Sequence, residues 1–366
     1  MSIINRIQER AVGLDVIRIS LSLLVLMFHS RICSLHCSYG IFNTFIDCGA
    51  IAMTGFFLLS GYVINLTYKG SDMTDIKRIG SFYLKRLISI LPVYLVLEIL
   101  FFVADFVLYG KLDALQNLVL FPVEILGIQS AYSSLFDYLH VDWFISCILI
   151  CYFIYPLLKI LTNDITDKSR IITIVFLFFI ILWSPIVQHV FHLQSIYTNP
   201  FFRAMEFYVG ILLSQLNTTE KPCKLIYFLR KPAICVCTVF WLFAGIFIFR
   251  INHISIDYML YNWVSLPCFA TILVSFGNLR PKGIINRSTF IKYLSELSFC
   301  LYLAQSINLW KVIQRLFEYG GLESNILKIT VSFLAYFGIA NILHYFIEVP
   351  SSNYLKRKLL QKIELQ

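Results

Sequence analysis

Charged residues are scarce in this chain of 366 residues: Asp, Glu, Lys and Arg make up 14% of it, whereas hydrophobic residues make up 58%. A soluble domain usually carries about 25% charged residues. The mean hydropathy of +0.76 is too high for a soluble chain, whose interior is too small to bury so much apolar surface. The composition therefore excludes a soluble enzyme and predicts an all-α, polytopic membrane helix bundle.

The sequence also lacks features that would add further domains or remove its first segment. No small-residue cleavage site follows a short apolar stretch near the N-terminus, so we expect the first apolar span to be retained. No repeat, low-complexity tract or separate soluble domain is apparent. We therefore predict a single membrane domain over residues 1–366.

No cysteine pattern typical of a metal-binding domain is present, although the chain has ten cysteines. Most of them lie inside apolar stretches, where a cysteine behaves as a small hydrophobic residue. Cys33, Cys37 and Cys48 flank the first external loop and can form one bridge if that side is oxidising. His36 lies among them, but the spacing matches no strong zinc pattern, so we predict no metal site.

About ten transmembrane spans can be drawn, and the basic residues orient them. Most of the 30 Lys and Arg residues fall on one side if the N-terminus is cytoplasmic, as the positive-inside rule requires. The net charge of +9 therefore marks the cytoplasmic side and not a nucleic-acid partner, and both termini are expected inside. The spans are 14–32, 47–67, 87–109, 142–161, 170–191, 201–216, 231–250, 258–277, 293–314 and 326–347.

The first span carries three ionisable residues, Asp15, Arg18 and His29. At about 100° per residue, Arg18 and His29 lie within roughly 20° of each other and about 16 Å apart along one helix face. An arginine at mid-bilayer costs about 2.5–3.5 kcal/mol, and the ten Leu, Ile, Val and Phe residues between Leu14 and Phe28 return about 0.3–0.6 kcal/mol each. Either Arg18 snorkels and His29 caps the helix, or both face a wet passage that joins the two sides of the bilayer. We expect the second arrangement.

Two further regions carry polar groups. Small residues in the second span favour close helix packing, and Ser60 and Tyr62 alternatively line a polar cavity. The basic stretch that includes Lys85 and Arg86 is either a positive-inside anchor or a phosphate-recognising mouth.

Two outer segments complete the set. The semi-apolar connection from Gly110 to Val141, which contains Asp137 and His140, is expected to cover an outward cavity. Arg203 and Glu206 are three residues apart and can pair at the outer end of the sixth span.

Seven segments, in order along most of the chain, resemble the acyltransferase-3 family of integral membrane O-acyltransferases. The spacing of Arg18 and His29 alone is a weak signal, but seven segments in sequence order are a strong one. The segments are Leu14–Arg18 with His29, Phe56–Tyr62, Phe82–Pro92, Trp143–Phe144, Arg203–Gly210, Leu297–Leu303 and Phe346–Pro350.

The resemblance implies an enzyme of the bacterial cytoplasmic (inner) membrane. It would move an acyl group, most often acetyl, from cytoplasmic acyl-CoA to a hydroxyl of an extracytoplasmic carbohydrate such as O-antigen. Acetyl-CoA is then the donor substrate, no cofactor is bound tightly, and the partners are a lipid-linked or polymeric carbohydrate and membrane lipids.

Acyl transfer to a hydroxyl needs a base, and histidine suits this role because its pKa lies near neutrality. We assign His29 as that base or as a transient acyl carrier, Arg18 as a donor-binding cation, and Asp15 as the group that fixes Arg18. Other expected contacts are Lys85, Arg86, Ser60 and Tyr62 with the donor, and Arg203, Glu206, Trp143 and Tyr302 with the acceptor or the oxyanion.

Some positions depart from the family pattern, and a rival function remains. Ser89 and Val349 stand where arginine is common, Ile148 where glutamate is common, and Gln305 where histidine is usual. A sugar transporter or flippase, in which Arg18 and His29 line a path, also fits ten spans with buried charges. The absence of an inverted repeat or of paired midplane helix breaks disfavours it.

Overall fold

The computed structural model describes residues 11–32, 35–109, 130, 143–191, 196–219, 221–251, 261–277, 288–305, 307–321 and 324–360. Over these ranges the regular structure is helical throughout, and no strand is present. This agrees with the all-α prediction. Apart from Ser130, the expected outer segment 110–141 with Asp137 and His140 lies outside the described residues, and so does Cys33.

Most of the helices lie close to a predicted span, but α4 begins at Ile76, well before the predicted start at 87. They are α1 (Val12–Ile32), η2 (Gly40–Phe42), α2 (Asn43–Ile46), η3 (Gly49–Ile51), α3 (Ala52–Thr67), α4 (Ile76–Tyr109), α6 (Trp143–Asn163), α7 (Asp167–Val190), α8 (Pro200–Asn217), α9 (Lys224–Leu229), α10 (Pro232–Ile251), α11 (Asn262–Gly277), α12 (Thr289–Leu303), α13 (Ile307–Tyr319), α14 (Asn325–Ile342), η6 (Leu343–Glu348), α15 (Val349–Leu355) and η7 (Lys356–Leu360).

Six of these helical stretches are long and apolar enough to cross a bilayer. They are Val12–Ile32, Gly49–Thr67, Trp143–Asn163, Asp167–Val190, Pro232–Ile251 and Asn325–Leu359. The count of about ten spans stays a prediction. The ninth predicted span, 293–314, is not one helix, because α12 ends at Leu303 and α13 begins at Ile307. Gln305 lies in this interruption, where hydropathy alone gave no sign of a break.

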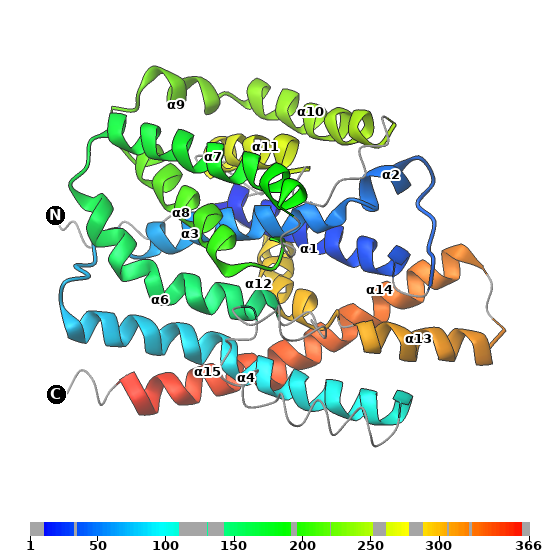
Figure 1. Ribbon diagram of the computed structural model, residues 1–366. Helices are drawn as coiled ribbons and strands as arrows, with labels where there is room; N and C mark the ends of the chain where they lie inside the picture. The colour runs from blue at the N-terminus through cyan, green and yellow to red at the C-terminus, as the bar shows by residue number, and fades with distance from the viewer. Residues whose placement is uncertain are drawn as a thin grey trace.

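The helices run back and forth across the bundle, as Figure 1 shows. α1 runs from left to right in this view, whereas α3 and α14 run from right to left. The connections that follow α3, α6 and α8 lie at the left end, where α15 also ends. These connections and the helix ends beside them hold many of the lysines and arginines that we place on the cytoplasmic side, among them Lys69, Lys77, Arg78, Lys159, Lys168, Arg170, Lys221 and Lys224. The structure thus gathers them at one end of the bundle.

Helix α3 lies at the centre of the bundle (Figure 1) and packs against α1, α8 and α11. Its glycines permit this close approach. A Cβ atom at Gly61 would overlap the carbonyl oxygen of Phe207 in α8, and one at Gly210 would overlap the carbonyl of Leu58. Gly55 lies against Leu21 of α1 in the same way. The predicted packing role of the small residues in this span is confirmed.

Candidate active site

One seam between α1 and α12 gathers the polar groups of the opening helix. Arg18 Nη1 donates to Ser295 Oγ at 3.1 Å, and Ser22 Oγ donates to the carbonyl oxygen of Ser298 at 3.2 Å. At the far end of the seam, His29 Nδ1 lies 3.1 Å from Gln305 Oε1. Arg18 and His29 therefore share one face of α1, as their spacing predicts, and this face packs on α12 instead of lipid.

A short relay of contacts orients the Arg18 guanidinium. Ser295 Oγ accepts from Arg18 and donates to Asp15 Oδ1 at 2.7 Å. Asp15 Oδ1 also lies 3.7 Å from Arg18 Nη1, an ion pair across one helical turn. The Arg18 side chain keeps one third of its surface exposed. Asp15 and Ser295 thus fix the charge while leaving one side of it accessible.

The hydrogen bonds of Gln305 identify the tautomer of His29. Gln305 Nε2 donates to the carbonyl oxygen of Leu301 at 2.8 Å, so its Oε1 atom is the one that faces His29. An amide oxygen only accepts, and Nδ1 of His29 therefore carries the hydrogen. The lone pair of the neutral imidazole then lies on Nε2, the atom that can take a proton.

A cavity of about 360 Å³ lies beside Arg18. This volume is within the usual range of small-molecule sites. Residues of α1, α3, α4, α6, α12 and η6 line it, and two of them are arginines, Arg18 and Arg86. Ser60 lines it as well, together with Tyr302 and Glu348. Two guanidinium groups over a half-apolar cavity suit a ligand that has phosphates at one end and a flexible arm at the other.

The two adjacent basic residues of α4 face different surfaces. Arg86 lines the cavity with Arg18, and its Cζ atom lies 5.6 Å from the ring centroid of Tyr68 and 5.9 Å from that of Tyr152. Lys85 lines a neighbouring hollow with Lys77 and Arg78. The structure therefore places Arg86, and not Lys85, beside Arg18.

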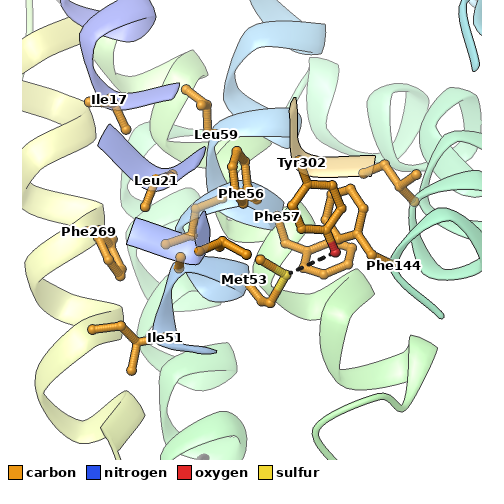
Figure 2. Packing of buried hydrophobic residues seen from close by; sticks show 14 of the residues in the cluster. Ile17, Leu21, Ile51, Met53, Phe56, Phe57, Leu59, Phe144, Phe269 and Tyr302 are labelled. Atoms are coloured by element: carbon orange, nitrogen blue, oxygen red, sulfur yellow. Dashed lines mark hydrogen bonds between the residues drawn. The ribbon is translucent and has the colours of Figure 1, made fainter. Parts of the chain in front are cut away.

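His29 is not among the residues that line this cavity, whereas Tyr302 is. Tyr302 lies near the end of α12, after Ser298, and Gln305 follows two residues beyond the helix end, so Tyr302 lies between the two ends of the seam. Its hydroxyl donates to Met53 Sδ at 3.5 Å, and its ring packs on Phe56 and Phe144, with centroids 5.6 and 4.8 Å away. Figure 2 shows these side chains meeting in the core. Arg18 lines this cavity and His29 does not, so the expectation that both residues face one continuous passage is not met by this cavity. The packing of Tyr302 on Phe56 and Phe144, which we call the aromatic closure, lies between them along the seam.

Tyr62 lies apart from this cavity. Its side chain is 1% exposed, its hydroxyl accepts from Asn217 Nδ2 at 2.6 Å, and it packs against Gly277. The sequence allowed both Ser60 and Tyr62 to line a polar cavity. In the structure Ser60 lines the cavity, whereas Tyr62 connects α3 to α8 and α11.

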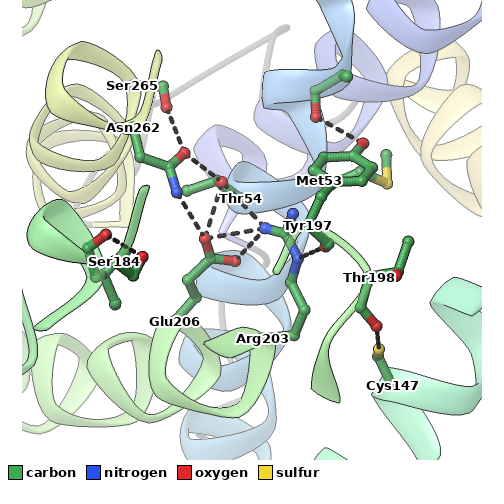
Figure 3. Close-up of polar contacts among 12 residues, drawn as sticks. Met53, Thr54, Cys147, Ser184, Tyr197, Thr198, Arg203, Glu206, Asn262 and Ser265 are labelled. Carbon is green, nitrogen blue, oxygen red and sulfur yellow. Dashed lines mark hydrogen bonds and ion pairs between the residues drawn. The ribbon is translucent and has the colours of Figure 1, made fainter. Parts of the chain in front are cut away.

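Arg203 and Glu206 form the buried ion pair that their spacing predicts, at 2.8 Å and with exposed fractions of 1% and 0%. Asn199 caps the start of α8 by accepting from the Phe201 amide, which fixes the register of the pair. Thr54 of α3 and Asn262 of α11 complete the network, as Figure 3 shows.

Aromatic rings enclose the Arg203 guanidinium. Its Cζ atom lies 4.7 Å from the ring centroid of Tyr197, 5.5 Å from Phe57 and 5.6 Å from Trp143. Its Nε atom donates to the carbonyl oxygen of Tyr197 at 2.7 Å. Among the described residues, three aromatic rings, a backbone carbonyl and the Glu206 carboxylate thus surround the guanidinium.

A family model described as an acyltransferase domain matches residues 12–345, which is most of the chain. The chain belongs to the acyltransferase-3 family. With its several apolar helices, this membership indicates a multi-pass membrane acyltransferase. No curated protein and no solved structure matches the chain.

In this acyltransferase, residues 37–47 contact the end of α1, which carries His29. Arg31 pairs with Asp47 at 2.6 Å, and the Ser30 and Tyr39 hydroxyls lie 2.7 Å apart. Burial raises the pKa of Tyr39 to about 12, although its hydrogen bond with Ser30 opposes this shift. Cys37 and Cys48 both carry free thiols, so neither forms the bridge that the sequence left open.

Sequence reasoning missed the partners that α12 supplies to the acyltransferase site. Gln305 was noted only as a departure from the family pattern, and Ser295 carries no signal of its own. A register of polar residues every three or four positions along 295–305 would have indicated a second polar helix face.

Proposed function

We propose that this acyltransferase moves an acetyl group from cytoplasmic acetyl-CoA to a hydroxyl of an extracytoplasmic carbohydrate such as O-antigen, in a bacterial inner membrane. The observation that carries the proposal is the α1–α12 seam. It joins a two-arginine cavity at the basic end of the bundle to an imidazole with a free Nε2 atom.

The cavity suits the donor in size and charge. A volume of about 360 Å³ is too small for the whole of acetyl-CoA but accommodates its pantetheine arm. Arg86 lies in the first third of α4, where the nucleotide phosphates would bind, because charge-assisted hydrogen bonds to guanidinium groups hold phosphates well. Arg18 lies beside Ser295, where it would contact the arm or the carbonyl of the thioester.

The chemical step is a direct transfer. The acceptor hydroxyl oxygen forms a bond to the thioester carbonyl carbon while Nε2 of His29 takes the hydroxyl proton. The tetrahedral intermediate then collapses, the carbon–sulfur bond breaks, and the leaving thiolate receives the proton from His29. Gln305 keeps Nδ1 protonated throughout, so that the imidazolium forms with both of its hydrogens in place.

The thioester and the hydroxyl must meet at His29, so the aromatic closure has to open during turnover. Tyr302 and Met53 share one weak contact, a hydroxyl-to-sulfur hydrogen bond of 3.5 Å. Rotation of the Tyr302 side chain would break this hydrogen bond and the ring packing on Phe56 and Phe144. We place Tyr302 at the boundary between donor and acceptor.

On the acceptor side, the Arg203–Glu206 pair is enclosed by Thr54, Asn262 and Tyr197. An enclosed pair stabilises the joint of α3, α8 and α11, so we assign Arg203 and Glu206 a positioning role. Trp143 packs between this pair and Phe144, which makes it the link from the pair to the aromatic closure.

The test compares surface glycans of the native bacterium with those of a strain that lacks the gene, by mass spectrometry, with complementation by wild-type protein and by His29→Ala. We expect the deletion strain to lose one acetyl increment, and only the wild-type gene to restore it. Loss of the glycan itself from the surface, with no change in its acetylation, would indicate the rival transporter function instead.

A further inference from the structure

A second cluster of reactive side chains lies on the other face of α12. Cys300 Sγ donates to Glu348 Oε2 at 3.2 Å, and His344 Nδ1 lies 2.8 Å from the same oxygen. One ligand atom from each of these three residues lies within 4.8 Å of the others. Among the described residues, this group alone brings histidine, cysteine and a carboxylate together so closely.

We propose that Cys300, His344 and Glu348 bind a divalent transition-metal ion, with zinc as the fitting metal. Zinc accepts thiolate, imidazole and carboxylate ligands at about 2.0–2.3 Å, so its donor atoms lie roughly 3–4 Å apart. The contacts in the cluster are already near that range. The proposal concerns metal binding alone and does not rest on the proposed function.

The charge of the cluster favours a divalent ion. Cys300 is fully buried, and the side chains of His344 and Glu348 are 10% and 22% exposed. Without a metal, Cys300 is a neutral thiol that donates to Glu348. An ion that replaced this proton would have to neutralise a thiolate and a carboxylate side by side in an apolar place, so a divalent ion fits. A divalent ion with one thiolate, one carboxylate and one neutral imidazole gives a net charge of zero. Metal binding releases the thiol proton to solvent.

The backbone supports the arrangement. His344 and Glu348 both lie on η6, a π-helical turn between α14 and α15, and such turns are common at functional sites. Glu348 also lines the cavity beside Arg18. A zinc site with an open fourth position has this arrangement: three protein ligands hold the ion, and its fourth side faces a cavity. Water or a soft group in the cavity supplies the fourth ligand.

The test measures metal in purified full-length protein in detergent. After incubation with zinc and removal of the excess, we expect elemental analysis to find one ion per chain in the wild type. Cys300→Ser and His344→Gln should each lose it, whereas Cys268→Ser, which removes a buried cysteine of α11 outside the cluster, should keep it.

Cobalt gives a second readout that does not depend on any variant. Bound Co²⁺ should produce the near-ultraviolet absorption of a cobalt–thiolate bond in the wild type and in Cys268→Ser, and zinc should displace it. The proposal is overturned if wild-type protein retains no more zinc than Cys300→Ser, or if its cobalt form shows no thiolate absorption. Both metal measurements are independent of the acetyl-transfer activity, which is measured in a separate assay.

Discussion

Gln305 Oε1 lies 3.1 Å from His29 Nδ1, and the other end of the same amide donates to the Leu301 carbonyl. A glutamine at this position does for the imidazole what a carboxylate does in other histidine sites: it fixes the tautomer and leaves Nε2 free. Because the partner is neutral, it does not stabilise the imidazolium as a carboxylate would. The base is oriented by a residue just beyond the end of α12, not by its own helix.

Replacing Gln305 tests this relationship. We expect Gln305→Leu to lower kcat by about 10²-fold, the lower end of what general-base catalysis contributes, because Nδ1 loses its acceptor. KM for acetyl-CoA should change little, because Gln305 is not among the residues that line the cavity. Steady-state kinetics of acetyl transfer in detergent or vesicles measures both constants.

Gln305→Glu is the control for that variant. Its carboxylate accepts the same hydrogen bond and stabilises the imidazolium, so activity should persist while the acidic limb of the pH–kcat/KM profile moves to higher pH. A purely structural role for Gln305 predicts equal losses in both variants and no shift of the profile.

Arg86 and Lys85 offer a matched pair of adjacent cations. Arg86 lines the two-arginine cavity, whereas Lys85 faces the neighbouring hollow. Losing a hydrogen bond to a charged group costs about 1.5–3 kcal/mol, so Arg86→Ala should raise KM for acetyl-CoA roughly 10- to 150-fold. Lys85→Ala should have a smaller effect, close to that of Lys231→Ala between α9 and α10. Equal effects of Arg86→Ala and Lys85→Ala would place the donor phosphates outside the cavity.

The buried Arg203–Glu206 pair should act mainly on stability. Glu206→Leu leaves an uncompensated buried guanidinium, which typically costs about 3–5 kcal/mol, so its unfolding temperature in detergent should fall markedly. The double variant Arg203→Met with Glu206→Leu should recover most of that loss, because no charge remains unpaired. If instead both variants keep wild-type stability and lose activity, the pair contacts the acceptor directly.

Gly61 tests the packing at the centre of the bundle. In Gly61→Ala the new methyl group would overlap the Phe207 carbonyl, and overpacking of this kind costs about 1–3 kcal/mol. Gly80→Ala is the control, since nothing lies within 4 Å of a Cβ atom there. It should leave stability unchanged or raise it by about 1 kcal/mol. Thermal unfolding measures the stability of both variants. A Gly61→Ala protein as stable as wild type would contradict the close α3–α8 contact.

Much of the helical layout follows from sequence, because the signals are local. Hydropathy located the apolar segments, and helical periodicity placed Arg18 and His29 on one face and paired Arg203 with Glu206. The break of the ninth span near Gln305 was missed, since the flanking residues are apolar and the average hydropathy of the segment hides polar residues such as Gln305 and Asn308.

The site was predicted less completely than the fold. Partners such as Ser295 and Gln305 lie more than 270 residues from Arg18 and His29, and no local pattern joins positions so distant. The orientations of Lys85 and Tyr62 depend on which neighbour packs beside each of them. The closure by Tyr302 depends in the same way on side chains from two other helices, α3 and α6.

Transfer of radiolabelled acetyl groups in membrane vesicles that expose the cytoplasmic face tests the central assignment most directly. Vesicles with wild-type protein, supplied with labelled acetyl-CoA outside, should transfer label to glycan acceptors on the luminal side. His29→Ala should reduce that transfer by about 10²- to 10⁴-fold, while His189→Ala, an exposed histidine of α7 outside the site, should transfer as the wild type does. Undiminished labelling by folded His29→Ala protein would contradict the assignment of His29 as the base.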